Sequence, residues 1–143
     1  MNAAISVRQV DVYHGAGARR FHAVRQADLE VAPRESFGLV GGSGSGKSSL
    51  LRVLAGLSSN WTGAITIAGE ALPPGRRPPR SFHRRVQMVF QDPYASLNPR
   101  HTVDRMLSEG LILHGFEDPE RRIRDVVDQV GVGPRFPFPY PHR

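Results

Sequence analysis

A glycine-rich segment that ends in a lysine and a serine carries the clearest chemical signal in this 143-residue chain. Residues 41–48 read Gly-Gly-Ser-Gly-Ser-Gly-Lys-Ser and fit the phosphate-binding pattern G-x-x-x-x-G-K-[ST]. Lys47 is the only lysine, and the remaining basic side chains of the 19 Lys and Arg are all arginine. A lysine ammonium is a compact charge on a flexible stem, whereas the arginine guanidinium is a rigid planar fork. The segment therefore predicts a site in which one ammonium reaches between phosphate oxygens.

Each residue type in this segment suits a nucleotide phosphate or its metal. Glycines allow backbone N–H groups to converge on phosphate oxygens at the N-terminus of a helix. Lys47 is expected to reach the β- and γ-phosphates, the Ser48 hydroxyl to bind Mg²⁺, and Ser49 to offer a further hydroxyl to phosphate. The predicted phosphate-binding residues are Gly41, Gly42, Ser43, Gly44, Ser45, Gly46, Lys47, Ser48 and Ser49.

The elements around this loop are those that a phosphate loop requires, namely a strand before it and a helix after it. The apolar run 36–40 predicts a strand buried on both faces, and residues 48–57 predict a helix. Before the loop, residues 5–12 alternate in polarity and then change phase, which predicts a strand with a bulge. Further strands are predicted at 27–31 and 63–69, so this part is expected to form antiparallel sheet.

The second half of the chain changes from strand to helix patterns. A loop rich in proline and arginine over 73–80 precedes a predicted strand at 86–90. Helices are predicted at 102–114 and from 118 to 130, the second opened by the capping pair Asp118 and Pro119. Residues 135–143 alternate with proline and are expected to form no regular element.

Composition narrows the class of protein. The chain has no cysteine and a net charge of +6, and it shows neither a signal peptide nor an apolar run that could span a bilayer. The densest basic stretch holds one aromatic residue, so we interpret it as a solvated loop and do not expect nucleic acid as a partner. A protein or lipid-headgroup contact is the alternative for this stretch. Its residues are Arg76, Arg77, Arg80, Phe82, Arg84 and Arg85.

Three stretches together resemble the ATP-binding subunit of an ABC transporter, particularly the branch that serves dipeptide, oligopeptide and nickel importers. They are the glycine loop, Val89-Phe90-Gln91-Asp92-Pro93 and Ser96-Leu97-Asn98-Pro99-Arg100. The resemblance implies an α/β P-loop NTPase core with an N-terminal antiparallel β subdomain and the start of a helical subdomain. It implies one partial ATP-binding domain, in which residues 1–92 form the β subdomain and P-loop core and residues 93–143 form the Q-loop and the first helices.

The resemblance also implies roles, ligands and partners. Tyr13 matches the aromatic residue that stacks on adenine, and Gln91 matches the glutamine that approaches Mg²⁺ and the attacking water. Lys47 and Gln91 would then be the catalytic residues, with ATP and Mg²⁺ as ligands. The implied partners are membrane-spanning permease subunits and a second nucleotide-binding subunit, in a homo- or heterodimer. The implied location is cytoplasmic, on the inner face of the cell membrane. The alternative for Tyr13 is an ordinary surface or edge tyrosine. The alternative for Gln91 is a loop glutamine that caps the end of a strand.

The sequence departs from the family pattern at three places. Ser49 stands where threonine is common, a change that keeps the hydroxyl. Arg34-Glu35 stands where Gly-Glu is common before the P-loop strand, and the printed sequence stops at Arg143, just before the expected Leu-Ser-Gly-Gly-Gln signature. The Walker B aspartate, its adjacent glutamate and the switch histidine would come later still. We therefore expect a truncated chain that binds nucleotide weakly, hydrolyses it poorly or not at all, and tends to aggregate.

Two other interpretations remain. One is a non-catalytic nucleotide-binding module that docks on a transporter. The other is an unrelated P-loop kinase or GTPase. A GTPase would need a guanine-reading Asn-Lys-x-Asp motif, which a chain with its only lysine at position 47 does not contain.

Overall fold

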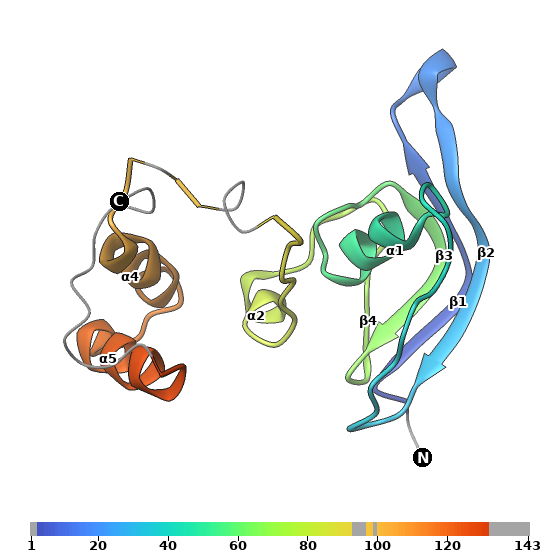
Figure 1. The fold of residues 1–143 in the computed structure, drawn as a ribbon. Coiled ribbons are helices and arrows are strands. Elements are labelled where there is room, and N and C mark those ends of the chain that lie inside the picture. Colours follow the sequence, from blue (N-terminus) through green and yellow to red (C-terminus); the bar gives the residue numbers. More distant parts are fainter. Residues whose placement is uncertain (1–2, 93–96, 99, 132–143) are drawn as a thin grey trace. The chain divides into compact units, whose positions relative to one another are not determined.

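The computed structural model describes residues 3–92, 97–98 and 100–131. They belong to two compact units, Met1–Met88 and Val89–Arg143 (Figure 1). The first unit contains an antiparallel sheet and the helix that follows the glycine loop. The described residues of the second contain two helices.

The predicted antiparallel sheet is confirmed in the first unit (Figure 1). Its strands are β1 (Ile5–His14), β2 (Phe21–Val31), β3 (Trp61–Ile67) and the short β4 (Glu70–Ala71). They lie in the order β2-β1-β3-β4, and every neighbouring pair is antiparallel. β2 begins well before the predicted strand at 27–31, and β4 was not predicted.

A bulge at Gln9 allows β1 to bury valines that the regular pleat would separate. Val7 and Val10 are three positions apart, so an unbroken strand would direct them to opposite faces. The register with β2 shifts between these valines, the register with β3 shifts between Arg8 and Asp11, and Gln9 has a φ of 46°. As a result Val7, Val10 and Val12 all have no exposed surface. The phase change in the sequence predicted this bulge.

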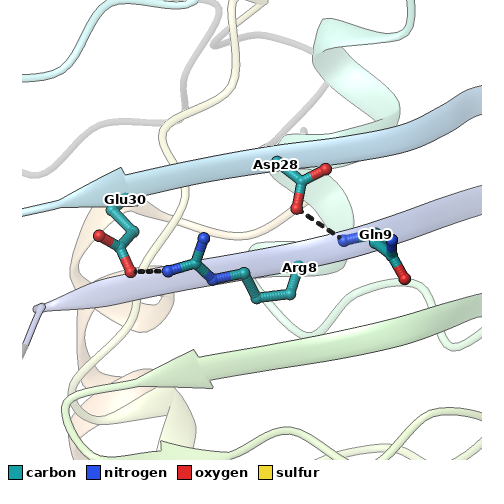
Figure 2. A network of polar contacts seen from close by, with 4 residues as sticks. All are labelled: Arg8, Gln9, Asp28 and Glu30. Atoms are coloured by element: carbon teal, nitrogen blue, oxygen red, sulfur yellow. Dashed lines mark hydrogen bonds and ion pairs between the residues drawn. The ribbon is translucent and has the colours of Figure 1, made fainter.

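Aspartate side chains accept hydrogen bonds from two backbone N–H groups at the irregular positions of the β1–β2 pair. The Gln9 N–H donates to Asp28 Oδ1 at 3.0 Å (Figure 2). In the reverse direction, the Gln26 N–H on β2 donates to Asp11 Oδ1 at 3.2 Å, and Gln26 also has a positive φ of 44°. Figure 2 also shows the exposed ion pair between Arg8 and Glu30 beside the bulge. Each strand therefore supplies a carboxylate that fixes the irregular backbone of the other.

Gly63 on β3 is the position most closely fitted to this bulge. Its φ is 100°, and a Cβ there would lie 2.4 Å from the Gln9 carbonyl oxygen. We expect Gly63→Ala to lower the free energy of unfolding by at least about 1–3 kcal/mol, the usual cost of a strained φ, because the backbone must also move. Urea unfolding measures the change. Gly69→Ala is the matched control, since Gly69 has a φ of 81° and no atom within 4 Å of its added Cβ. Equal losses in the two variants would contradict the proposed steric conflict.

Helix α1 (Lys47–Leu54) packs the glycine loop against the sheet. Its buried side chains Leu50, Val53 and Leu54 join sheet residues in one core cluster. α1 ends at Leu54 rather than at residue 57 as predicted, and Gly56 adopts a φ of 71° after it. The other buried members of this cluster are Val7, Val10, Val12, Trp61, Ile65, Ile67, Leu72 and Phe82.

A short helix, α2 (Arg80–His83), adds Phe82 to this core and was not predicted. The Arg85 guanidinium just after it hydrogen-bonds the Glu70 carboxylate on β4. That hydrogen bond and the positive charge lower the pKa of the Glu70 carboxyl below its usual value. This contact connects part of the basic stretch to the sheet.

Two predicted strands are wrong. Residues 36–40 and 86–90 adopt no regular secondary structure, although both are apolar. Val40 and Val89 are each 95% exposed. A strand buried on both faces depends on hydrogen-bonded neighbours in its sheet. Within the described residues neither segment has such a neighbour, so an apolar pattern alone does not produce a strand here.

The second unit confirms both predicted helices, α4 (Val103–Leu113) and α5 (Pro119–Gln129). Thr102 Oγ1 accepts from the Arg105 N–H at 3.4 Å, and Asp118 Oδ1 accepts from the Arg121 N–H at 3.0 Å. Both helices thus begin at side-chain caps, of which the sequence predicted the one at Asp118. No helix in the described ranges is both long and apolar enough to cross a membrane. The predicted irregular segment 135–143 lies outside the described residues.

Candidate functional site

The glycine loop leads directly into α1, and Gly46 forms the boundary between them. Gly46 is the N-cap residue, with a φ of 90°, and no side chain caps the helix. The first N–H groups of an α-helix have no partner within the helix and form a favourable place for an anion. The absence of a side-chain cap leaves this end of α1 suited to a phosphate group.

Lys47 is held over the loop that precedes it. Its Nζ donates to the Gly41 carbonyl at 2.8 Å, the Gly42 carbonyl at 2.6 Å and Ser45 Oγ at 3.1 Å. An ammonium has three hydrogens, so these three contacts match its donors. The loop therefore holds the Lys47 ammonium among the acceptors of residues 41–45. A phosphate oxygen would replace one or more of these acceptors.

A cavity of about 230 Å³ lies at the start of α1. Its lining comes from two parts of the first unit. The loop and helix contribute Gly44, Ser45, Gly46, Lys47, Ser48 and Ser49, and the sheet region contributes His14, Phe21 and Ala23. His14 Nε2 lies 2.7 Å from Ser49 Oγ, which joins the end of β1 to the first turn of α1.

The predicted phosphate-binding residues fit a phosphate group in this arrangement. A Cβ added at Gly42 or Gly44 would meet no atom within 4 Å, so there is open space beside the loop backbone. Ser48 is exposed and lines the cavity. The combination of an uncapped helix start, a central ammonium and open space is what phosphate binding requires.

Tyr13, the predicted adenine-stacking residue, has two groups against its ring. The Arg20 guanidinium carbon lies 3.6 Å from the ring centroid, and the His22 ring stacks at a centroid distance of 4.5 Å with an interplanar angle of 24°. His22 Nε2 lies 2.6 Å from Asp11 Oδ1, which fixes the imidazole. The ring is thus held in place from the sheet, and a base that stacks on it would have to displace one of these neighbours.

Gln91 belongs to the second unit and is exposed. Its role beside Mg²⁺ and the attacking water stays a prediction. The sequence interpretation missed His14, Arg20 and His22. His14 contacts a residue 35 positions away, and no sequence spacing signals such a contact.

The chain is similar to ABC transporter proteins in sequence. The family model described as ABC transporter matches residues 24–137. The oligopeptide transport ATP-binding protein AmiF of Streptococcus pneumoniae serotype 4 is 37% identical over 144 residues, covering 96% of this chain and 47% of AmiF. The glutathione import ATP-binding protein GsiA of Escherichia coli (strain K12) is 38% identical over 130 residues, covering 87% of this chain and 20% of GsiA. The chain thus spans less than half the length of these relatives.

The fold is also found in a solved structure. The dimeric ATP-binding cassette MJ0796, in a post-hydrolysis state bound to ADP and Pi, matches with a TM-score of 0.73 at 20% identity. The match covers 96% of this chain and 61% of MJ0796. This confirms the predicted α/β cassette fold with its antiparallel β subdomain. With the family model matched over most of its length, the chain belongs to the ABC transporter family.

Proposed function

We propose that this chain is the nucleotide-binding part of an ABC importer's ATP-binding subunit, with ATP and Mg²⁺ as its ligands. The observation that carries the proposal is the position of the Lys47 ammonium, bonded to the carbonyls of Gly41 and Gly42 beside an uncapped helix N-terminus. A positive charge beside the first N–H groups of a helix favours an anionic group such as phosphate.

The residues divide into three groups in this proposal. The loop residues 41–49 hold the phosphates, with Lys47 on the β- and γ-phosphates and Ser49 as a further donor. Ser48 and Gln91 hold Mg²⁺, which would neutralise phosphate charge. Tyr13 stacks on the adenine base. Lys47 and Gln91 are the catalytic residues.

We also propose a place and partners for the whole protein. Oligopeptide and glutathione import are named for AmiF and GsiA, which favours a peptide-like cargo, with nickel as the alternative. Importers of this kind need membrane-spanning permease subunits. The dimeric state of MJ0796 favours a second nucleotide-binding subunit. The expected location is the cytoplasmic face of the cell membrane.

A nucleotide series titrated into the purified chain tests the proposed ligand. Mg·ATP and Mg·ADP are expected to bind, and AMP to bind at least about tenfold more weakly, because it lacks the phosphates that Lys47 is proposed to contact. Titration calorimetry gives the three dissociation constants. Equal binding of AMP and ATP would contradict a site centred on the phosphate loop.

Removal of Arg20 tests the role of Tyr13. If adenine takes the place of the guanidinium on this ring, Arg20→Ala should raise ATP affinity about two- to fivefold, because an exposed cation–π contact is worth about 0.5–1 kcal/mol. Arg19→Ala is the matched control, since it removes the same charge from the adjacent residue, in the short 3₁₀ helix Gly17–Arg19. If Arg20→Ala and Arg19→Ala bind ATP with the same affinity, the result would argue against stacking of adenine on Tyr13.

A further inference from the structure

His14 occupies a place in the candidate site to which none of the roles above is assigned. It is the last residue of β1, and it directly follows Tyr13. Its Nε2 lies 2.7 Å from Ser49 Oγ, in the first turn of α1. Both side chains line the same cavity as Lys47. His14 therefore lies next to the adenine-stacking residue in the chain and contacts a proposed phosphate ligand in space.

The direction of the hydrogen bond between His14 and Ser49 decides what Ser49 can do. A serine hydroxyl has one hydrogen to donate and lone pairs to accept. If that hydrogen points to an unprotonated His14 Nε2, it is not available to a ligand. If the Nε2–H of His14 donates to Ser49 Oγ, the hydroxyl hydrogen remains free and can point into the cavity. Only the second arrangement provides a donor to an anion.

We propose that His14 is a positioning residue of the nucleotide site, which donates to Ser49 Oγ and thereby directs the Ser49 hydroxyl hydrogen to a phosphate oxygen. The inference rests on the proposed nucleotide-binding function and adds a residue to it. The bound anion fixes the His14 tautomer with its hydrogen on Nε2, because this tautomer leaves Ser49 as the donor. Hydrogen bonds in such a chain polarise and strengthen one another.

A double-mutant cycle on Mg·ATP affinity tests the proposal. The variants are His14→Ala, Ser49→Ala and the double variant, each measured by titration calorimetry. Each single variant is expected to lose about fivefold in affinity, and the double variant no more than the larger single loss, because the two residues act as one donor. His14→Gln should keep more affinity than His14→Ala, since its amide N–H can still donate to Ser49 Oγ.

Controls separate this role from a structural one. His101→Ala removes a histidine from the second unit and should leave the affinity unchanged. Thermal unfolding of each variant shows whether the contact affects only stability. The inference is overturned if the losses of the two single variants multiply in the double variant, if His14→Ala changes unfolding but not affinity, or if the glutamine and alanine variants lose affinity equally.

The same titrations distinguish failure of this inference from failure of the proposed function. If the wild-type chain binds Mg·ATP and Lys47→Ala does not, but His14→Ala binds as wild type does, only the role of His14 is wrong. If the folded wild-type chain binds no Mg·ATP, the proposed function is wrong, and the inference falls with it.

Discussion

Replacement of Lys47 by alanine is expected to weaken Mg·ATP binding by at least about tenfold. A hydrogen bond to a charged group contributes about 1.5–3 kcal/mol, and the ammonium is proposed to make such bonds to the β- and γ-phosphates. The variant also removes the three contacts through which Lys47 Nζ holds the loop. Titration calorimetry with Mg·ATP, on protein shown to be folded by circular dichroism, measures the loss.

Two other variants make the Lys47 result specific. Arg52→Ala removes one positive charge from the last turn of the same helix, and it should leave ATP affinity nearly unchanged. Lys47→Arg keeps the charge but replaces a flexible ammonium by a planar fork, so we expect an intermediate affinity. Wild-type affinity in the Lys47→Ala variant would contradict the proposed site, because the ammonium would then contribute nothing to binding.

Replacement of Gly46 by alanine is expected to destabilise the fold and to weaken nucleotide binding in the same variant. The φ of Gly46 is 90°, and an added Cβ would lie 2.6 Å from the Ala23 carbonyl oxygen and 2.7 Å from Val24 Cγ2. The strained φ alone costs about 1–3 kcal/mol, and the backbone conflict adds to it. We expect thermal unfolding to shift down by roughly 5–10 °C. Nucleotide affinity should fall as well, because the start of α1 must move away from β2.

Gly44→Ala separates backbone strain from the steric conflict at Gly46. Gly44 also has a positive φ, 79°, but a Cβ there would meet no atom within 4 Å. Its variant should therefore unfold at a higher temperature than Gly46→Ala. If the two variants were equally stable, the close approach of Gly46 to β2 would not be a determinant of stability.

The parts of the fold that local chemistry determines could be predicted from the sequence. Helices α4 and α5 begin at Thr102 and Asp118 because those side chains cap the backbone directly after them. The bulge in β1 follows from the three-residue spacing of Val7 and Val10. The phosphate loop is equally local, since all three acceptors of Lys47 lie within six residues of it.

The parts that depend on distant residues could not be predicted in this way. Residues 36–40 and 86–90 have the composition of buried strands, but strand formation depends on a neighbouring strand, which a local pattern does not supply. Likewise, nothing in the sequence around His14 indicates Ser49. The contact exists because β1 ends beside the first turn of α1, which is a consequence of how the helix packs on the sheet.

Mapping of the nucleotide on the chain by NMR is the most direct test of the central claim, that residues 41–49 bind the phosphates of ATP. Backbone amide resonances of the ¹⁵N-labelled chain would be recorded during titration with Mg·ATP. The account predicts that the largest shifts occur at the amides of residues 42–49, with further changes at Tyr13 and His14. Shifts confined to other parts of the chain, or no shifts at all in a folded sample, would contradict it.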